Sequence, residues 1–398
     1  MNAHGAGQSR SRRLHAIILT RDRADECGRC VDLALSALGR HDFLTILDDS
    51  APSATAENHA LLTTAAGCSN TMVSHLSATR VHDAVADAFG GSRLAWQCRS
   101  APRDIAPLRN LSLLLSATVG AQTTIMIDDD VVGFDLEATY SFIAEQQYEP
   151  RGIIVGAEIG GLTEMDTITR LEHAMARLME RPYQERAPVS DLFRAASVNG
   201  SQDAGACHWV SAGYMALNVQ HARLVAFPPG YNEDWVWCLL QRAEYGTQTL
   251  KSGHTVLHEP ATMRHPTCDD IQFELAGDLI LDSLVECGAV EAQGRACALR
   301  RLCGYRPDSS MLPAGRVAEV MQQVAEAERM GRLHPDLWEY GLRALKDMLD
   351  GDALGVDGTA LVSAWCRDAE AKQLSFAPML TNTAVLTALE ALLIKGRV

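Results

Sequence analysis

The segment TTIMIDDD, residues 123–130, joins an apolar run to three adjacent carboxylates. The run Thr123–Ile127 is β-branched and apolar, which is typical of a strand buried in an α/β sheet. Ligands of such sheets bind beyond the carboxyl ends of the strands. Asp128, Asp129 and Asp130 repel one another, and a divalent cation such as magnesium or manganese would offset their charge. We therefore interpret the triplet as a candidate metal site, with a solvated acidic turn as the alternative.

Strand and helix patterns alternate upstream of this triplet. His15–Thr20 predicts a buried strand, Ala24–Leu38 an amphipathic helix, and Phe43–Leu47 a second strand that ends in Asp48-Asp49-Ser50. Such a strand–helix–strand unit implies parallel strands joined by a right-handed crossover. Residues 50–100 give weaker signals, with one helix expected near Val81–Phe89. These patterns predict an α/β fold.

The expected elements around and after the triplet complete a sheet and then become helical. Pro107 favours a helix through about Val119. The later predictions are strands at Gly152–Ala157, His208–Asn218 and Thr255–Leu257, a helix at Asp166–Glu180, a mobile loop at 183–207, and helices at Phe273–Glu286, Arg316–Met330, Trp338–Met348 and Thr383–Ile394. We expect a disordered tail at 1–13, a catalytic domain at 14–267 and a helical C-terminal domain at 268–398.

Composition limits the classes of partner. The 398 residues are 47% hydrophobic and 21% charged, which is ordinary for a globular protein. The net charge of −15 argues against a general binder of nucleic acid or of anionic membranes. The apolar stretch Ala16–Leu19 is too short for a signal sequence, and no apolar run approaches the roughly 18 residues of a membrane span. We therefore expect a cytoplasmic protein without a membrane span.

The eleven cysteines do not form a disulfide framework in this interpretation. Cys27 and Cys30 share a helical stripe with apolar residues, which favours a place in the core. A redox pair or half of a zinc site is the alternative.

Five segments of the first 265 residues occur in the order of known motifs. They are Thr20-Arg21-Asp22-Arg23, Leu47-Asp48-Asp49-Ser50, Leu108-Arg109-Asn110-Leu111, Asp128-Asp129-Asp130, and the pair Ser211-Ala212-Gly213-Tyr214 with Asn232-Glu233-Asp234-Trp235. In this order they resemble the GT-A glycosyltransferases, in particular the large bacterial inverting family that uses nucleotide-sugars. The resemblance implies a Rossmann-like mixed sheet flanked by helices, a nucleoside diphosphate sugar donor, a small acceptor, and Mn²⁺ or Mg²⁺ as cofactor.

The resemblance also implies roles for individual residues. Asp49 would pair with the uracil or guanine ring, Arg109 would face the diphosphate, and Asp129 would point towards the ribose. Asp128 and Asp130 match the DxD motif and would bind the metal. The other residues expected in the nucleotide-sugar site are Thr20, Arg21, Asp48 and Gly213. The first loop lacks the aromatic residue of the family pattern, so the choice of base stays open.

Sugar transfer needs groups on both sides of the bond that breaks. Negative charge builds on the leaving diphosphate, where a metal held by Asp130 and the cation of Arg109 would stabilise it. The acceptor hydroxyl needs a general base, for which Asp234 is the candidate, with Glu233 beside it. The alternative is that these acids cap the helix Trp235–Arg242.

His258 is the candidate for a third metal ligand, because it follows a short strand where such a chain returns to the donor site. The alternative is a histidine with a satisfied hydrogen bond. His254 and His265 are weaker candidates. The tryptophans 209, 235 and 237 could line a sugar platform, although core packing is the favoured interpretation.

Two other functions stay open at this point. Asp128-x-Asp130-x-Val132 also fits a haloacid-dehalogenase-like phosphatase that uses Asp128 as nucleophile, with Lys251 and Gly277-Asp278-x-x-x-Asp282 as its later motifs. That class requires the later acidic motif to follow a buried strand, whereas 273–286 predicts a helix. A non-catalytic sugar-nucleotide-binding protein is the second alternative. The apolar stripes of 268–398 suggest packing against the catalytic domain or in a homo-oligomer.

Overall fold

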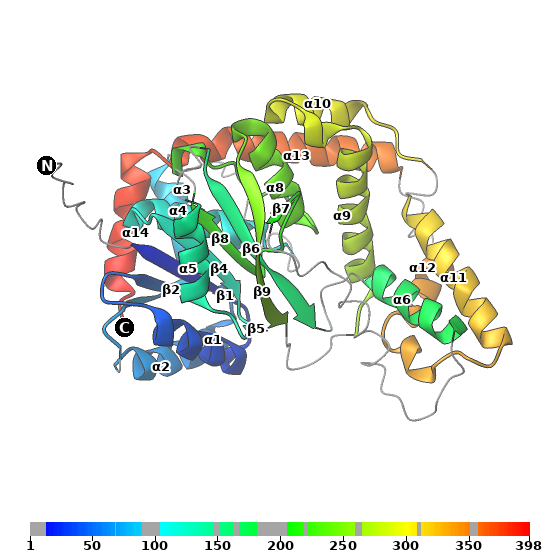
Figure 1. Ribbon diagram of the computed structural model, residues 1–398, viewed down its shortest axis with the longest axis horizontal. Coiled ribbons are helices and arrows are strands. Elements are labelled where there is room, and N and C mark those ends of the chain that lie inside the picture. Colours follow the sequence, from blue (N-terminus) through cyan, green and yellow to red (C-terminus); the bar gives the residue numbers. More distant parts are fainter. Residues whose placement is uncertain are drawn as a thin grey trace, which may run out of the picture.

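The computed structural model describes residues 13–67, 69–89, 104–146, 151–161, 167–180, 205–218, 221–258, 265–308, 312–350 and 357–398 (Figure 1). The expected tail, apart from Arg13, and most of the loop expected at 183–207 lie outside these residues.

A mixed nine-stranded sheet forms the centre of the described part of the molecule, in the order β3-β2-β1-β4-β8-β6-β9-β5, with β7 paired to β9 (Figure 1). The strands are β1 Leu14–Thr20, β2 Phe43–Asp48, β3 Met72–Ser77, β4 Thr123–Asp128, β5 Val131–Val132, β6 Ile153–Gly161, β7 Gly205–Cys207, β8 Tyr214–Asn218 and β9 Gln248–His258. The strands β3, β2, β1 and β4 are parallel, and β8 is antiparallel to both β4 and β6. The α/β fold class expected from the sequence is confirmed.

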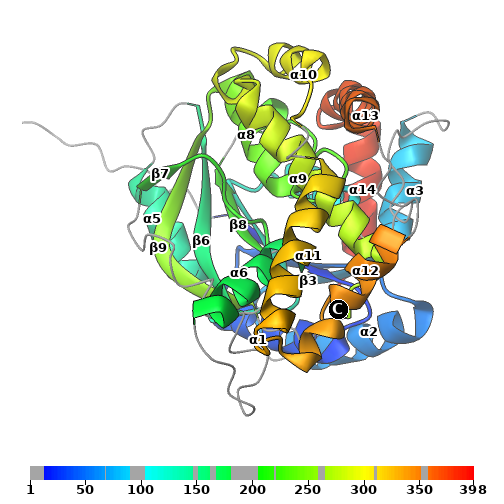
Figure 2. The ribbon, with the colours of Figure 1, turned by 90° about the vertical axis from the view of Figure 1, so that its right-hand side faces the viewer.

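Helices cover both faces of this sheet and extend beyond it (Figures 1 and 2). They are α1 Ala24–Ala37, α2 Pro52–Ala66, α3 Ala78–Ala88, α4 Ala106–Val119, α5 Leu136–Glu145, α6 Thr167–Glu180, α8 Glu233–Tyr245, α9 Cys268–Glu286, α10 Arg295–Gly304, α11 Pro313–Arg329, α12 Leu342–Asp350, α13 Gly358–Met379 and α14 Thr383–Lys395. Among these described helices, no single one is both long and apolar enough to cross a membrane; only the bent pair α13 and α14, taken together, meets that test.

Side chains of the central strands alternate between two cores. In β1, Ala16 and Ile18 pack with α1, α2 and α5, whereas Ile17 and Leu19 pack with α3, α4, α8 and α14. Both faces of the strand are therefore buried, which explains its continuous apolar sequence. Cys27 and Cys30 belong to the first core, as expected, and burial raises the pKa of the Cys27 thiol to about 12.

The last helix returns to the sheet. α14 packs against α3 and α4, and Leu389 is fully buried in the same core as the strand residue Leu19. Beyond α14, the Gly396 carbonyl accepts a hydrogen bond of 2.9 Å from the His75 amide, which ties the C-terminal residues to the edge strand β3. The boundary expected near residue 267 coincides with the start of α9 and stays a prediction.

This packing predicts a large effect of truncating Leu389, which is 0% exposed. Leu389→Ala should lower the free energy of unfolding by about 2–5 kcal/mol, because a cavity would form between α14 and the sheet. Ile394 lies on the same helix and is 56% exposed, so Ile394→Ala should change the free energy of unfolding by less than about 0.5 kcal/mol. Urea unfolding measures the free energy of unfolding of both variants. Equal losses in the two variants would show that α14 does not belong to the core.

Several predicted elements differ in extent. The strand expected at His208–Asn218 begins only at Tyr214, because Ser211–Gly213 form a turn whose Gly213 carbonyl accepts a hydrogen bond from the Asp128 amide. The helix expected from Trp338 begins at Leu342, because Gly341 has a φ of 136°. The strand expected at Thr255–Leu257 is the end of the longer β9.

Candidate functional site

The register of the parallel strands brings the predicted site residues to one edge of the sheet. Thr20 pairs with Asp48, and Leu19 pairs with Asp128, so the carboxyl ends of β1, β2 and β4 lie side by side. The pairing continues beyond the strands, because the Asp49 amide donates to the Thr20 carbonyl and the Asp129 amide donates to the Leu19 carbonyl. This is the edge where α/β sheets bind ligands.

Asp129 is held by the loop that follows β1. The Thr20 hydroxyl donates to one Asp129 oxygen at 2.8 Å, and Arg23 Nη1 lies 3.0 Å from the other. Arg23 also pairs with Asp130. Burial raises the pKa of Asp129 to about 7, although the charge of Arg23 acts in the opposite direction. The sequence analysis did not assign Arg23 a role, although it lies inside the quoted Thr20–Arg23 motif.

His258 reaches the triplet through an antiparallel strand pair. β5 begins directly after Asp130, and its first residue Val131 pairs with His258 at the end of β9. His258 Nε2 lies 2.7 Å from Asp130 Oδ1. Burial acts to raise the pKa of Asp130, but the hydrogen bond from His258 and the charges of His258 and Arg23 outweigh it, so this pKa is lowered. The structure thus brings two of the three predicted metal ligands, Asp130 and His258, into contact.

Asp128 supplies an acceptor atom without a partner. Its Oδ1 is buried and has no hydrogen bond in the described part of the structure. Its Oδ2 lies 3.4 Å from Arg109 Nη2, and burial raises the pKa of this carboxyl group. Such an atom is suited to a cation, because leaving a buried acceptor unpaired is unfavourable.

The donor set, two carboxylates and an imidazole, therefore fits a divalent cation in the chemical type of its ligand atoms. Among the described residues, no group of three such side chains stands in an arrangement ready to hold a metal. Instead, Asp130 bonds both His258 and Arg23. Metal binding would require Asp130 and His258 to exchange these bonds for bonds to the ion.

A buried arginine joins the triplet to the second acidic pair. Arg109 lies on α4 and is 4% exposed. Its Nε lies 3.1 Å from Glu233 Oε1, and its Nη1 lies 3.9 Å from Asp234 Oδ2. Neither of these nitrogens makes a hydrogen bond of good geometry, so the contacts are charge pairs. The guanidinium is the shared counter-ion of three carboxylates from two distant segments.

The acidic pair begins α8 and is itself buried. Asp234 Oδ2 accepts a hydrogen bond of 2.7 Å from the Ala212 amide, and its Oδ1 accepts one of 2.8 Å from the Trp235 amide. The bond to Ala212 fixes the turn before β8 and is not a helix cap. Burial raises the pKa of Glu233, although the charge of Arg109 opposes this shift. Asn232, which precedes the helix, has a φ of 58° and makes no capping bond with its side chain.

Asp49, the residue expected to pair with the base, lies in the second of two linked loops. Arg21 Nε donates to Asp49 Oδ2 at 3.0 Å. The Asp22 amide donates to the Ser50 hydroxyl at 2.7 Å, and the Ala51 amide donates to Asp22 Oδ1 at 2.7 Å. These bonds connect the two loops beside the triplet.

Asp48 supports the second loop from inside the fold. It accepts hydrogen bonds from the Ser50 amide at 2.8 Å, from Asn58 Nδ2 at 2.9 Å and from His75 Nε2 at 2.8 Å. Burial acts to raise its pKa, but these hydrogen bonds outweigh burial and lower it. The sequence analysis missed Asn58 and His75, because both lie in the region between residues 50 and 100 whose patterns were weak.

The remaining candidates lie elsewhere. His254 is exposed, and His265 bonds the Glu339 carbonyl, so the structure does not place either at the triplet. Trp237 is fully buried against Phe227, which confirms core packing for this residue, whereas Trp209 and Trp235 stack with ring centroids 5.7 Å apart.

The phosphatase alternative lacks the strand that it requires. Asp278 and Asp282 lie within α9, and Asp278 is engaged by Asn232 and Arg316. Neither aspartate follows a buried strand in the described structure, so the geometry does not support this alternative.

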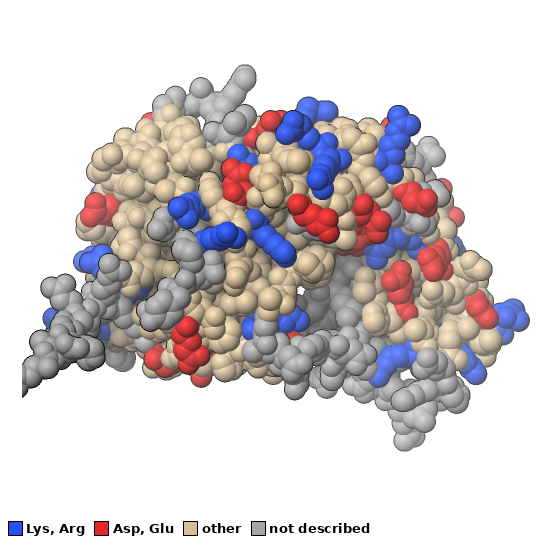
Figure 3. Space-filling model, turned by 45° about the horizontal axis from the view of Figure 1, so that its top comes forward, with Lys and Arg blue, Asp and Glu red and all other residues tan. Residues whose placement is uncertain are grey.

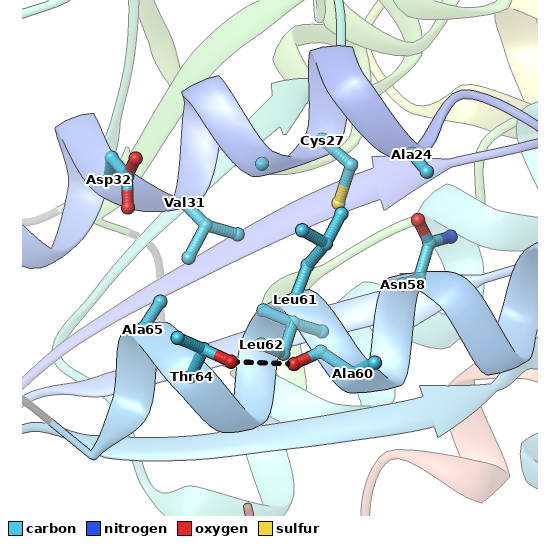
Figure 4. A pocket seen from close by; sticks show the side chains of 11 residues that line it. Ala24, Cys27, Val31, Asp32, Asn58, Ala60, Leu61, Leu62, Thr64 and Ala65 are labelled. Atoms are coloured by element: carbon cyan, nitrogen blue, oxygen red, sulfur yellow. Dashed lines mark hydrogen bonds between the residues drawn. The ribbon is translucent and has the colours of Figure 1, made fainter.

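A cleft between α1 and α2 is lined by Cys27, Val31, Asn58, Leu61 and neighbouring residues (Figure 4). No residue that the sequence analysis placed in the site lines this cleft. Its lining is largely apolar, and the predicted chemistry lies at the strand ends instead.

Comparisons with known proteins found similarity only among solved structures. No protein-family model matches the chain, and no curated protein matches it. Glucosyl-3-phosphoglycerate synthase from Mycobacterium tuberculosis, in complex with Mn²⁺, UDP-glucose and phosphoglyceric acid, is 16% identical, with 75% of this chain and 82% of that chain covered and a TM-score of 0.38. S. aureus TarS 1–349 is 12% identical, with 92% and 90% covered and a TM-score of 0.39. Mouse xyloside xylosyltransferase 1 is 13% identical, with 53% and 68% covered and a TM-score of 0.29.

By name, one of these three proteins is a glucosyl-3-phosphoglycerate synthase and another is a xylosyltransferase. Similarity at this level does not carry a function, so the function proposed below rests on the residues of the chain itself.

Proposed function

We propose that this protein is a metal-dependent glycosyltransferase that moves a sugar from a nucleoside diphosphate sugar to a nucleophile, such as a hydroxyl group, of a small acceptor. The observation that carries the proposal is the position of Arg109. Its buried guanidinium pairs with Asp128 of the triplet and with Glu233 and Asp234 of α8. A donor-side acidic motif and an acceptor-side acidic pair therefore share one fixed cation.

The donor side has a residue for each part of a nucleotide-sugar. Asp49, with Arg21, lies in the loops that would take up the base. Asp128, Asp130 and His258 would hold Mn²⁺ or Mg²⁺, which supplies positive charge to the diphosphate when it is bound. Arg109 adds a cation that needs no reorganisation, because it is already buried and paired. Asp129, bonded to Thr20 and Arg23, keeps the first loop against the triplet.

The acceptor side requires a group that removes a proton from the acceptor hydroxyl. Asp234 is held rigidly by the Ala212 amide at 2.7 Å, and each carboxylate oxygen keeps a second lone pair for the incoming proton. Glu233 would hold Arg109 in place from its other side. The two acids then have different tasks, one as general base and one as positioning residue.

Donor binding is the first experimental test. Nucleoside diphosphate sugars should raise the melting temperature when manganese is present, since ligand at about 100 times its dissociation constant stabilises the folded state by about 2.7 kcal/mol. Sugar nucleotides with each base can be screened in this way, with the free sugars as controls. If no nucleotide-sugar stabilises the protein in the presence of manganese, the proposal is wrong.

The non-catalytic alternative, a sugar-nucleotide-binding protein, predicts a different fate for the nucleotide-sugar. A binding protein would be stabilised by the nucleotide-sugar but would leave it intact. An enzyme should slowly transfer the sugar to water, even without its acceptor, and so release the free sugar and the nucleoside diphosphate. Measuring that release with manganese, with and without EDTA, separates the two functions.

The expected partners are small molecules. Acidic and basic side chains are interspersed on the face in Figure 3, and the chain carries a net charge of −15. Neither feature favours a nucleic-acid partner. We propose a cytoplasmic enzyme in which residues 268–398 cover the catalytic domain or contribute to a homo-oligomer.

The ligand role of His258 gives a further prediction. His258→Ala should raise the manganese concentration needed for half-maximal activity, because imidazole is a good manganese ligand that adds no negative charge. His254→Ala is the matched control, since His254 is exposed on the same strand. An unchanged manganese requirement in His258→Ala would assign His258 only the hydrogen bond to Asp130.

A further inference from the structure

Two histidines outside the proposed donor site face one another. His59 is exposed on α2, whereas the side chain of His75 on β3 is 5% exposed. Their Nδ1 atoms lie 3.3 Å apart, and the two rings are stacked with centroids 5.4 Å apart. We propose that His59 and His75 form a binding site for a divalent transition metal of the zinc class, distinct from the acidic triplet.

The tautomer of His75 is set by Asp48. His75 Nε2 lies 2.8 Å from Asp48 Oδ2, and an ionised carboxylate can only accept a hydrogen bond. The proton of the neutral ring is therefore on Nε2, and the lone pair on Nδ1 is directed at His59. A carboxylate that accepts from the far nitrogen of a histidine is the usual support of a metal-binding imidazole.

The carboxylate that orients His75 is itself fixed. Asp48 also accepts hydrogen bonds from the Ser50 amide and from Asn58 Nδ2, and these bonds keep its pKa low although burial acts to raise it. The His75 amide donates to the Gly396 carbonyl at 2.9 Å. Hydrogen bonds thus hold both the backbone and the ring of His75.

The separation of the two nitrogens matches a shared metal. Zinc–nitrogen bonds of about 2.0–2.1 Å in tetrahedral geometry place two ligand nitrogens about 3.3–3.4 Å apart. The observed Nδ1–Nδ1 separation is 3.3 Å, which is long for a hydrogen bond. Two imidazoles favour zinc or cobalt over magnesium, which prefers oxygen ligands.

The site would be open to solvent. Among the described residues, no third histidine, cysteine or acidic side chain is placed to bind a metal ion together with this pair. Because His59 is exposed, water can supply the other ligands. A metal there would link α2 to the edge strand β3 and would fix Asp48, the residue directly before the proposed base-binding Asp49.

Zinc titration of the full-length protein tests this site. The titration is done in an Asp130→Asn background, so that the proposed donor-site metal does not contribute. Calorimetry should show one zinc ion fewer per chain when His59→Ala is added. His41→Ala is the control, because His41 is also exposed, and it should leave the zinc stoichiometry unchanged.

Equal zinc binding with and without His59→Ala would overturn the proposal, as would the absence of zinc binding up to millimolar concentration. A second variant tests the role of Asp48. Asp48→Asn should weaken zinc binding at this site about 10–100-fold, the usual cost of removing such a supporting carboxylate. Substituting cobalt identifies the ligands, because imidazole ligation lacks the charge-transfer absorption of a thiolate, which would instead point to cysteines.

Discussion

Asp130→Asn should abolish sugar transfer, with a loss of at least about 10²–10³-fold, and should weaken donor binding in manganese. The amide keeps the shape of the side chain but loses the charge that would offset the cation. It also loses the ion pair with Arg23 and the charged acceptor of the His258 hydrogen bond at 2.7 Å. Nucleoside diphosphate release, measured over a range of manganese concentrations, gives both the rate and the metal requirement.

Asp83→Asn is the matched control for this substitution. Asp83 lies on α3 with its side chain 68% exposed, so the same chemical change should leave activity at the wild-type level. The melting temperature of each variant without metal shows whether the fold is intact. A folded Asp130→Asn protein with wild-type rates, or a wild-type enzyme that is insensitive to EDTA, would contradict metal dependence.

Asp234→Asn should lower the transfer rate by about 10²–10⁴-fold, the usual contribution of a general base, with little change in donor affinity. The amide oxygen can still accept the hydrogen bond from Ala212, so the turn before β8 should persist. The rate at saturating donor and acceptor is the informative quantity. Loss of donor binding or of folding in this variant would assign Asp234 a structural role.

Glu233→Gln distinguishes the two acids of the pair. Glu233 contacts Arg109 Nε at 3.1 Å, so neutralising it should mainly disturb the position of that guanidinium. The expected result is a higher KM for the donor and a smaller fall in kcat than in Asp234→Asn. If Glu233→Gln instead shows the larger fall in kcat with an unchanged KM, Glu233 is the base.

The sequence predicted the strand ends that build the donor side. β1, β2 and β4 are continuous apolar runs, and each run is followed by polar residues at the carboxyl end. A local pattern of this kind is sufficient to predict that Thr20, Asp48 and Asp128 lie at one edge of a parallel sheet.

Two of the elements that were missed, α2 and β3, have weak local patterns. α2 buries only Asn58 and Leu62, so its sequence shows little helical amphipathicity. β3 carries His75 among small and apolar residues, and the C-terminal residues that cover its edge come from more than 300 positions away. Neither element could be predicted with its partners from the sequence around it.

The pairings within the site depend on contacts between distant segments. Asp130 meets His258 because β5 pairs with the last residues of β9. Arg109 meets Glu233 because α4 and α8 cover the same face of the sheet. The sequence identified these residues by type and by motif, whereas only the fold places Arg109 between the two acidic groups.

The structure of a complex with manganese and a nucleoside diphosphate sugar tests the central claim most directly, with the metal located by its anomalous scattering. We expect a manganese ion within about 2.0–2.3 Å of an Asp130 oxygen and of the His258 imidazole, in contact with the diphosphate and on the same side of Arg109 as Asp128. A metal more than about 3 Å from both residues, or a nucleotide-sugar bound away from the carboxyl ends of β1, β2 and β4, would contradict the proposed enzyme.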